Sequence, residues 1–142
     1  MGKMRLIQLA TQSIKDDEGR VLYAYQDSEG YWTIGDGHLI DKRRGGGISR
    51  AIADAILRED ILAHIEWLSQ QAFFRKCNET RQVLLVNMCH NLGRRGLLKF
   101  KRMIAAIYAE DWGKAADEIL DSVAAHKLKV RYQRLANQMR VG

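Results

Sequence analysis

Apolar residues recur at helical spacing in the first segment of the chain. They lie three or four positions apart, at Leu6, Ile7, Ala10 and Ile14. This spacing places them on one face and predicts an amphipathic helix. The pattern stops at residues 16–19, where Gly19 can adopt the left-handed conformation that ends many helices.

Residues 21–38 follow a different pattern, rich in aromatic and β-branched residues and interrupted by glycines. This composition is typical of strands, and residues 28–30, Ser-Glu-Gly, predict a turn between two short ones. Residues 41–47 are charged and then glycine-rich, which indicates a loop.

The rest of the chain has helical periodicity. Ser49 predicts the N-cap of a long helix that ends near Leu68. Asn78 predicts the cap of a second helix, which is apolar nearly all round and is expected at the centre of the core, with Gly93 just past its end. Three further helices are predicted from their apolar faces. The first face contains Phe100, Ile104 and Ile107. The second helix is capped by Asp111 and has Trp112, Ala116, Ile119, Leu120 and Val123 on its apolar face, and the third has Leu128, Tyr132, Leu135 and Met139. One helix, a small β-hairpin and a helical bundle predict an α+β fold.

Composition narrows the class of protein. The chain has 142 residues, no proline, two cysteines and a formal charge of +6, a size typical of one domain. Cys77 and Cys89 flank one predicted helix, which would separate them by about 18 Å, so we expect no disulfide between them. The N-terminal residues are too polar for a signal peptide, and no apolar run is long enough to span a membrane.

The segment that begins at Glu18 carries an ordered motif. It reads E-G-x-x-L-x-A-Y-x-D-x-x-G-x-x-T-I-G-x-G-H and ends at His38. This motif resembles the phage lysozymes of the T-even type, glycoside hydrolase family 24, and weaker similarity continues over nearly the whole chain. The resemblance implies one lysozyme-like domain over residues 1–142. A β-hairpin lobe of about residues 18–48 would be joined by a long helix to a helical lobe of about 69–142, which the N-terminal helix completes.

Hydrolysis of a glycosidic bond requires a proton for the leaving oxygen and an activated water. Glu18 lies where the first helix ends, and Asp27 and Thr33 lie on opposite sides of the predicted turn. The resemblance implies that Glu18 is the general acid and that Asp27, with Thr33, positions the water. It also implies an inverting reaction on the β-1,4 bond from N-acetylmuramic acid to N-acetylglucosamine in peptidoglycan, without a cofactor. The two carboxyl groups are then expected about 6.5–9.5 Å apart.

Other residues receive supporting roles. We assign substrate contacts to Gly37, Leu39, His90 and Asn91, and a structural role to His38. The resemblance implies that Arg131 reaches Glu18.

Three positions bear on these roles without adding a catalytic group. Asp36 would raise the pKa of neighbouring carboxyl groups if it points into the cleft. Ala124 replaces a tryptophan of related proteins, so we expect a smaller or repacked core there. His90 follows Cys89, but this spacing fits no zinc pattern, and we predict no metal site.

Three hypotheses for function remain. The first is a monomeric muramidase that lyses a bacterial host for a phage or prophage, passing from the host cytoplasm to the cell wall with the help of a holin. The second is a muramidase-like module that binds peptidoglycan with little or no turnover. The third is a nucleic-acid binder, suggested by basic clusters at residues 42–44, 94–102 and 127–140. No nucleic-acid motif accompanies these clusters, so we favour transient contact with an anionic cell envelope.

Overall fold

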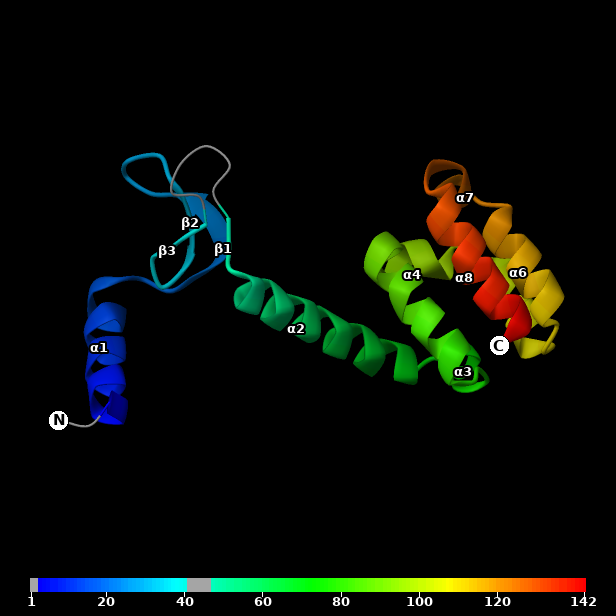
Figure 1. Ribbon diagram of the computed structural model, residues 1–142, viewed down its shortest axis with the longest axis horizontal. Helices are drawn as coiled ribbons and strands as arrows, with labels where there is room; N and C mark the ends of the chain where they lie inside the picture. The colour runs from blue at the N-terminus through cyan, green and yellow to red at the C-terminus, as the bar shows by residue number, and fades with distance from the viewer. Residues whose placement is uncertain (1–2, 41–46) are drawn as a thin grey trace. The chain divides into compact units, whose positions relative to one another are not determined.

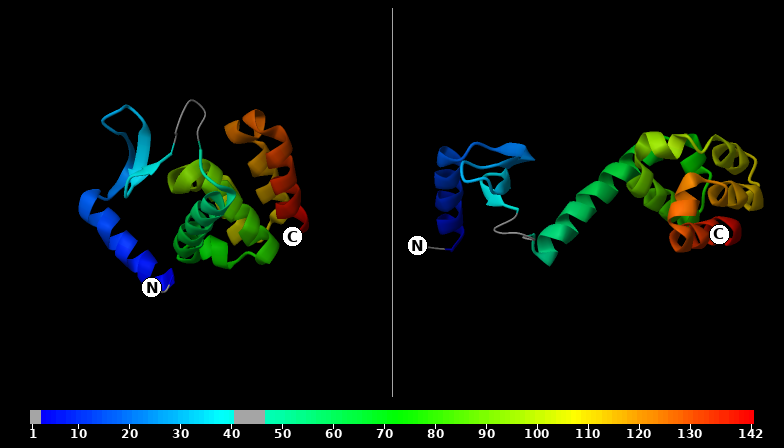
Figure 2. Two further views of the ribbon diagram at one scale, coloured as in Figure 1. Left: turned by 60° about the vertical axis from the view of Figure 1, so that its left-hand side comes forward. Right: turned by 90° about the horizontal axis from the view of Figure 1, so that it is seen from above.

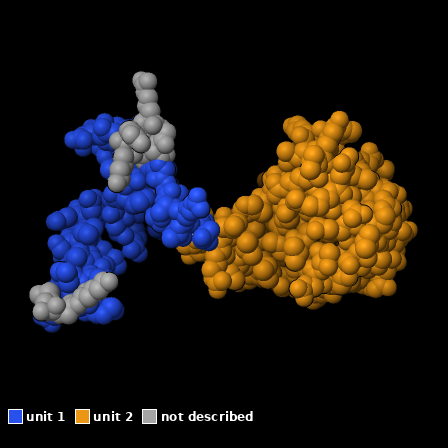
Figure 3. Space-filling model, viewed as in Figure 1, with its two compact units in different colours: residues 1–54 blue, residues 55–142 orange. Residues whose placement is uncertain are grey.

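The computed structural model describes residues 3–40 and 47–142 and shows the predicted α+β fold (Figure 1). In chain order the elements are α1 (Lys3–Asp17), β1 (Val21–Gln26), β2 (Trp32–Gly35), β3 (His38–Leu39), α2 (Arg50–Ser69), α3 (Ala72–Arg75), α4 (Glu79–Leu98), α5 (Lys101–Tyr108), α6 (Trp112–Leu120), α7 (Val123–Lys127) and α8 (Lys129–Val141). Contacts divide the chain into two compact units, residues 1–54 and 55–142 (Figure 3). Residues 41–46 of the predicted loop lie outside the described residues.

Unit 1 consists of α1, a three-stranded antiparallel sheet of order β1-β2-β3, and the first turn of α2. The predicted end of α1 is confirmed, because the helix stops at Asp17. The predicted turn is also confirmed, and Gly30 adopts a φ of 87° there. The sequence did not predict β3 as a strand of its own; it pairs with β2 through Thr33 and Leu39.

Local capping explains where the long helices begin. The Ser49 hydroxyl accepts a hydrogen bond from the Ile52 amide (3.2 Å), as its predicted N-cap role requires. The Asn78 carboxamide accepts one from the Arg81 amide (3.0 Å), and the Asp111 carboxylate accepts one from the Lys114 amide (3.1 Å). All three predicted caps are therefore confirmed.

The hydrophobic core of unit 2 forms around α4. Leu84, Leu85, Met88 and Cys89 of this helix are fully buried. Helix α8 packs against α6 and α4 (Figures 1 and 2). The sequence predicted that this helix ends just before Gly93, and the structure shows a break at Gly93 (φ 74°, ψ 168°). The helix resumes beyond it and ends at Leu98.

A buried arginine of α4 contacts both α6 and the end of α8. The Arg81 guanidinium lies 3.9 Å from the centre of the Trp112 ring. Its Nε donates to the carbonyl of Met139 (2.8 Å), near the end of α8. The ring face and the negative end of the helix dipole both stabilise the positive charge.

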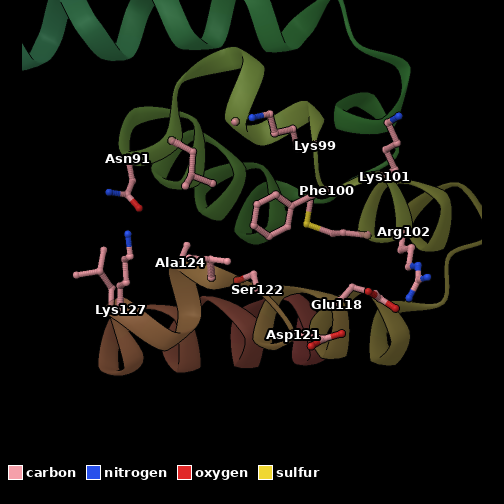
Figure 4. A pocket seen from close by; sticks show the side chains of 15 residues that line it. Asn91, Lys99, Phe100, Lys101, Arg102, Glu118, Asp121, Ser122, Ala124 and Lys127 are labelled. Atoms are coloured by element: carbon pink, nitrogen blue, oxygen red, sulfur yellow. The ribbon is translucent and has the colours of Figure 1, made fainter.

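A cavity of about 840 Å³ opens in unit 2 beside Ala124. Its lining is mostly apolar, and Figure 4 shows Ala124 on one wall and Phe100 on the facing wall. Around it lie four cationic residues, Lys99, Lys101, Arg102 and Lys127, and two acidic ones, Glu118 and Asp121. We expected a smaller or repacked core at this position. The structure instead shows open space, because the alanine methyl group is too short to reach the facing wall.

Replacement of Ala124 by tryptophan is therefore expected to stabilise the protein. Burial of a large side chain contributes about 1.5–3 kcal/mol, which corresponds to a rise in Tm of about 5–10 °C for a chain of this size. The measurement is thermal unfolding followed by circular dichroism. Val130→Trp is the matched control, because Val130 is 82% exposed and does not line the cavity. Equal Tm values for the two variants would show that the cavity does not accept the indole.

Candidate active site

The carboxylate of Glu18 lies against the turn between β2 and β3. Glu18 directly follows α1, and its amide donates to the carbonyl of Ile14 (2.8 Å), which continues the helical pattern by one residue. A methyl group added at Gly37 would lie 2.8 Å from Glu18 Cδ and 2.9 Å from Oε1. Gly37 also has a φ of 75°, which side chains disfavour. The sequence assigned Gly37 to substrate contact, and the structure adds that it makes room for the Glu18 carboxylate.

The Asp27 carboxylate is held by the backbone of the turn that follows it. Its Oδ1 accepts hydrogen bonds from the amides of Glu29 (2.9 Å) and Tyr31 (2.8 Å). Both amides engage the same oxygen, so Oδ2 remains available for another donor. The side chain is half-buried, and these bonds fix its direction.

Thr33 lies in the middle of the same sheet. It pairs with Tyr25 of β1 and with Leu39 of β3, and only 3% of its surface is exposed. Its hydroxyl donates to the carbonyl of Tyr31 (3.1 Å), which leaves the oxygen lone pairs available to accept. The peptide groups of Tyr31 therefore bond to both Asp27 and Thr33. These contacts use only the backbone of Tyr31, so residue type does not reveal them.

Asp36 forms an ion pair with Arg20 instead of standing as an isolated third carboxylate. The Arg20 guanidinium donates to Asp36 Oδ2 at 2.7 and 3.0 Å. This hydrogen bond, with the positive charge of Arg20, lowers the pKa of Asp36 below its usual value. The carboxylate is thus ionised and its charge is compensated, which weakens the repulsion that the sequence suggested for neighbouring carboxyl groups. Sequence analysis missed Arg20, since the two residues are separated by the whole hairpin.

The remaining predicted residues of unit 1 are placed by the sheet. Leu39 is half-buried opposite Thr33, and His38 is exposed opposite Ile34. Glu18, Asp27, Thr33, Gly37 and Leu39 therefore all belong to one helix end and one small sheet. The assignment of individual roles to them stays a prediction.

Three predicted residues lie in unit 2. Asn91 accepts a hydrogen bond from the Tyr132 hydroxyl (2.7 Å), and Arg131 donates to the Asn87 carboxamide through Nε (3.0 Å) and a terminal nitrogen (2.6 Å). His90 is exposed and contacts His64. The contact of Arg131 with Glu18, and the substrate contacts of His90 and Asn91, stay predictions.

Two observations concern other classes of site within residues 3–40 and 47–142. No group of three or more His, Cys, Asp or Glu side chains is arranged there to hold a metal ion. None of the helices in this part of the chain has the length and apolar character needed to cross a membrane.

Comparison with known proteins gives one consistent result. A family model described as phage lysozyme matches residues 15–138. The chain is 26% identical to "Probable T4-type lysozyme 1" of Dictyostelium discoideum, over 92% of this chain and 95% of the relative. It is 31% identical to "Pre-baseplate central spike protein Gp5" of Enterobacteria phage T4, over 87% of this chain but only 26% of that protein.

A second Dictyostelium discoideum protein, "Probable T4-type lysozyme 2", is 24% identical over 91% of this chain and 92% of the relative. The family match includes the segment from Glu18 to Gly37 whose geometry is described above. Because this match extends over most of its length, the chain belongs to the phage lysozyme family.

Proposed function

We propose that this lysozyme hydrolyses the β-1,4 bond between N-acetylmuramic acid and N-acetylglucosamine in peptidoglycan, with inversion at the anomeric carbon. The observation that carries the proposal is the fixed direction of the Asp27 carboxylate, on the same sheet whose β2–β3 turn supports Glu18. This arrangement supplies two carboxyl groups with different surroundings, as glycoside hydrolysis requires.

In the proposed reaction Glu18 gives its proton to the oxygen of the leaving sugar. Asp27 Oδ2 accepts a proton from water, while the Thr33 oxygen accepts a hydrogen bond from the same water. The water oxygen then forms a bond to the anomeric carbon as the glycosidic bond breaks. The cycle ends when Glu18 regains a proton from solvent and Asp27 releases one.

The biological role that we propose is lysis of a bacterial host by a phage or prophage. The protein would act as a monomer that passes from the host cytoplasm to the cell wall, with a holin as the route. The charge of +6 supports transient contact with an anionic envelope. The competing hypothesis is a module that binds peptidoglycan with little or no turnover.

The proposal is tested with purified bacterial sacculi. We expect soluble fragments that carry N-acetylmuramic acid at the reducing end. NMR should show that this end is released first as the α-anomer. A β-anomer would exclude inversion, and a 1,6-anhydro end would exclude hydrolysis by water. Binding to sacculi without release of fragments would support the competing hypothesis.

The contact between Gly37 and Glu18 leads to a prediction about the site. Gly37→Ala is expected to lower the hydrolysis rate by about 100-fold. The new methyl group would displace the Glu18 carboxylate, and a misplacement of about 1 Å in a catalytic group can cost about that factor. Gly35→Ala is the matched control, since Gly35 has a similar φ of 70° but nothing within 4 Å of the added methyl group. Both variants carry backbone strain, so a common fall in Tm is expected. Equal rates in the two variants would contradict the steric explanation.

A further inference from the structure

Two histidines from different helices of unit 2 meet at hydrogen-bonding distance. His64 lies on α2 and His90 on α4, and His64 Nε2 is 3.0 Å from His90 Nδ1. The ring centres are 5.2 Å apart, and the ring planes are inclined by 74°. His90 is exposed and His64 is half-buried, so solvent reaches the pair. The proposed catalytic mechanism uses neither His64 nor this contact.

A third side chain orients His64. The buried sulfur of Cys89 lies 3.6 Å from His64 Nδ1, the ring nitrogen that does not face His90. With the ring hydrogen on Nδ1 directed at this sulfur, the lone pair of Nε2 is directed toward His90. Metal-binding histidines are commonly fixed by such a contact at the second ring nitrogen.

We propose that His64 Nε2 and His90 Nδ1 form a binding site for a divalent transition-metal ion, which links α2 to α4 and completes its coordination with water. Metal–imidazole bonds of about 2.0–2.1 Å and the observed separation of 3.0 Å together give an N–metal–N angle of about 94°. This angle is close to that of adjacent ligands in tetragonal Cu²⁺ or Ni²⁺ sites and well below the tetrahedral angle that Zn²⁺ adopts. The geometry therefore favours Cu²⁺ and Ni²⁺ over Zn²⁺.

The charges around the pair have both signs. Burial, the neighbouring His90 and the cation of Arg94 lower the pKa of His64, while the carboxylate of Asp60 acts in the opposite direction. Arg94 lies over the Trp67 ring, with 5.5 Å between its Cζ and the ring centre, which engages its positive charge.

The sequence predicted no metal site because only the adjacent Cys89 and His90 were considered. His64 is 26 positions before His90, and neither helix pattern relates the two. The site that the structure assigns uses one nitrogen from each helix, and the thiol acts by orienting His64.

Calorimetric titration of the tag-free protein with NiCl₂ tests this proposal. One site per chain is expected in the parent protein, and His64→Gln and His90→Gln should each weaken it by at least about tenfold, because loss of an orienting partner alone costs about 10–100-fold. His126→Gln is the matched control, since His126 is an exposed histidine on α7, and its affinity should match that of the parent. Cys89→Ala removes only the orienting contact, so it should keep one site per chain and weaken it by no more than either histidine substitution.

A measurement on the parent protein keeps the test independent of how the variants fold. Electron paramagnetic resonance of the Cu²⁺-loaded protein should show coupling to two nitrogen donors. Absence of a nitrogen-coupled site would overturn the proposal and leave the histidines as a hydrogen-bonded pair. Parent-like Ni²⁺ affinity in both His64→Gln and His90→Gln would also overturn the proposal. Loss of the site in His126→Gln would overturn it as well.

Discussion

Glu18→Gln is expected to lower the rate of peptidoglycan hydrolysis by about 1,000-fold, since general acid catalysis contributes about 10²–10⁴-fold. Glutamine has the shape of glutamate and can occupy the same space over Gly37, but it carries no proton that it can give to a leaving sugar. Glu18 is exposed and lies outside the hydrophobic core. The substitution should therefore leave Tm and binding to sacculi unchanged.

The rate is measured as the release of soluble fragments from sacculi, with turbidity of outer-membrane-stripped cells as a second readout. Glu29→Gln is the matched control, because Glu29 is an exposed glutamate in the same unit and contacts Asp27 through its backbone amide. This control should keep the parent rate. Retention of more than about a tenth of the parent rate by Glu18→Gln would remove Glu18 from the role of general acid.

Asp27→Asn is expected to lower the rate by about 100–1,000-fold, in the range of a lost general base. The asparagine carbonyl can still accept from the amides of Glu29 and Tyr31, so the turn should keep its conformation. An amide nitrogen then replaces Oδ2, the oxygen that is proposed to accept the proton of water. The prediction is thus a loss of turnover without a loss of stability.

Comparison with Asp27→Ala separates catalysis from support of the turn. Alanine removes both the base and the acceptor of two amide hydrogen bonds, so the alanine variant should also unfold more easily, by about 1 kcal/mol. Rates of all three proteins are measured on sacculi, and their stabilities by urea unfolding. A parent-like rate in Asp27→Asn, together with a loss of stability like that of Asp27→Ala, would show that Asp27 supports the turn and takes no part in the reaction.

The start of each long helix could be predicted from the sequence because capping is local. Ser49, Asn78 and Asp111 each bond to an amide three residues later. Such a contact depends on residue type and short spacing, both of which are visible in a linear chain. The hairpin follows the same logic, since residues 28–30 and the flanking β-formers specify the turn without help from the rest of the fold.

The motif from Glu18 to His38 also lies within one short stretch, so the candidate catalytic residues could be named from the sequence. Their surroundings could not. The support that Gly37 gives to Glu18 depends on how the third strand returns toward the end of α1. The pairing of Arg20 with Asp36 depends on the register of the hairpin.

The sequence by itself determined the longer helices, three helix caps, the hairpin and the order of the residues that carry the family motif. It did not predict α3, the continuation of α4 beyond Gly93 or the separate helix α7 that begins at Val123. Only the tertiary structure decided which distant side chains meet, such as His64 with His90 and Arg81 with Trp112. It also decided that Ala124 lines an open cavity. The physical reason is the range of the interactions. Caps and turns are satisfied within about four residues, whereas contacts between helices depend on how whole faces pack, which the pattern of one segment does not specify.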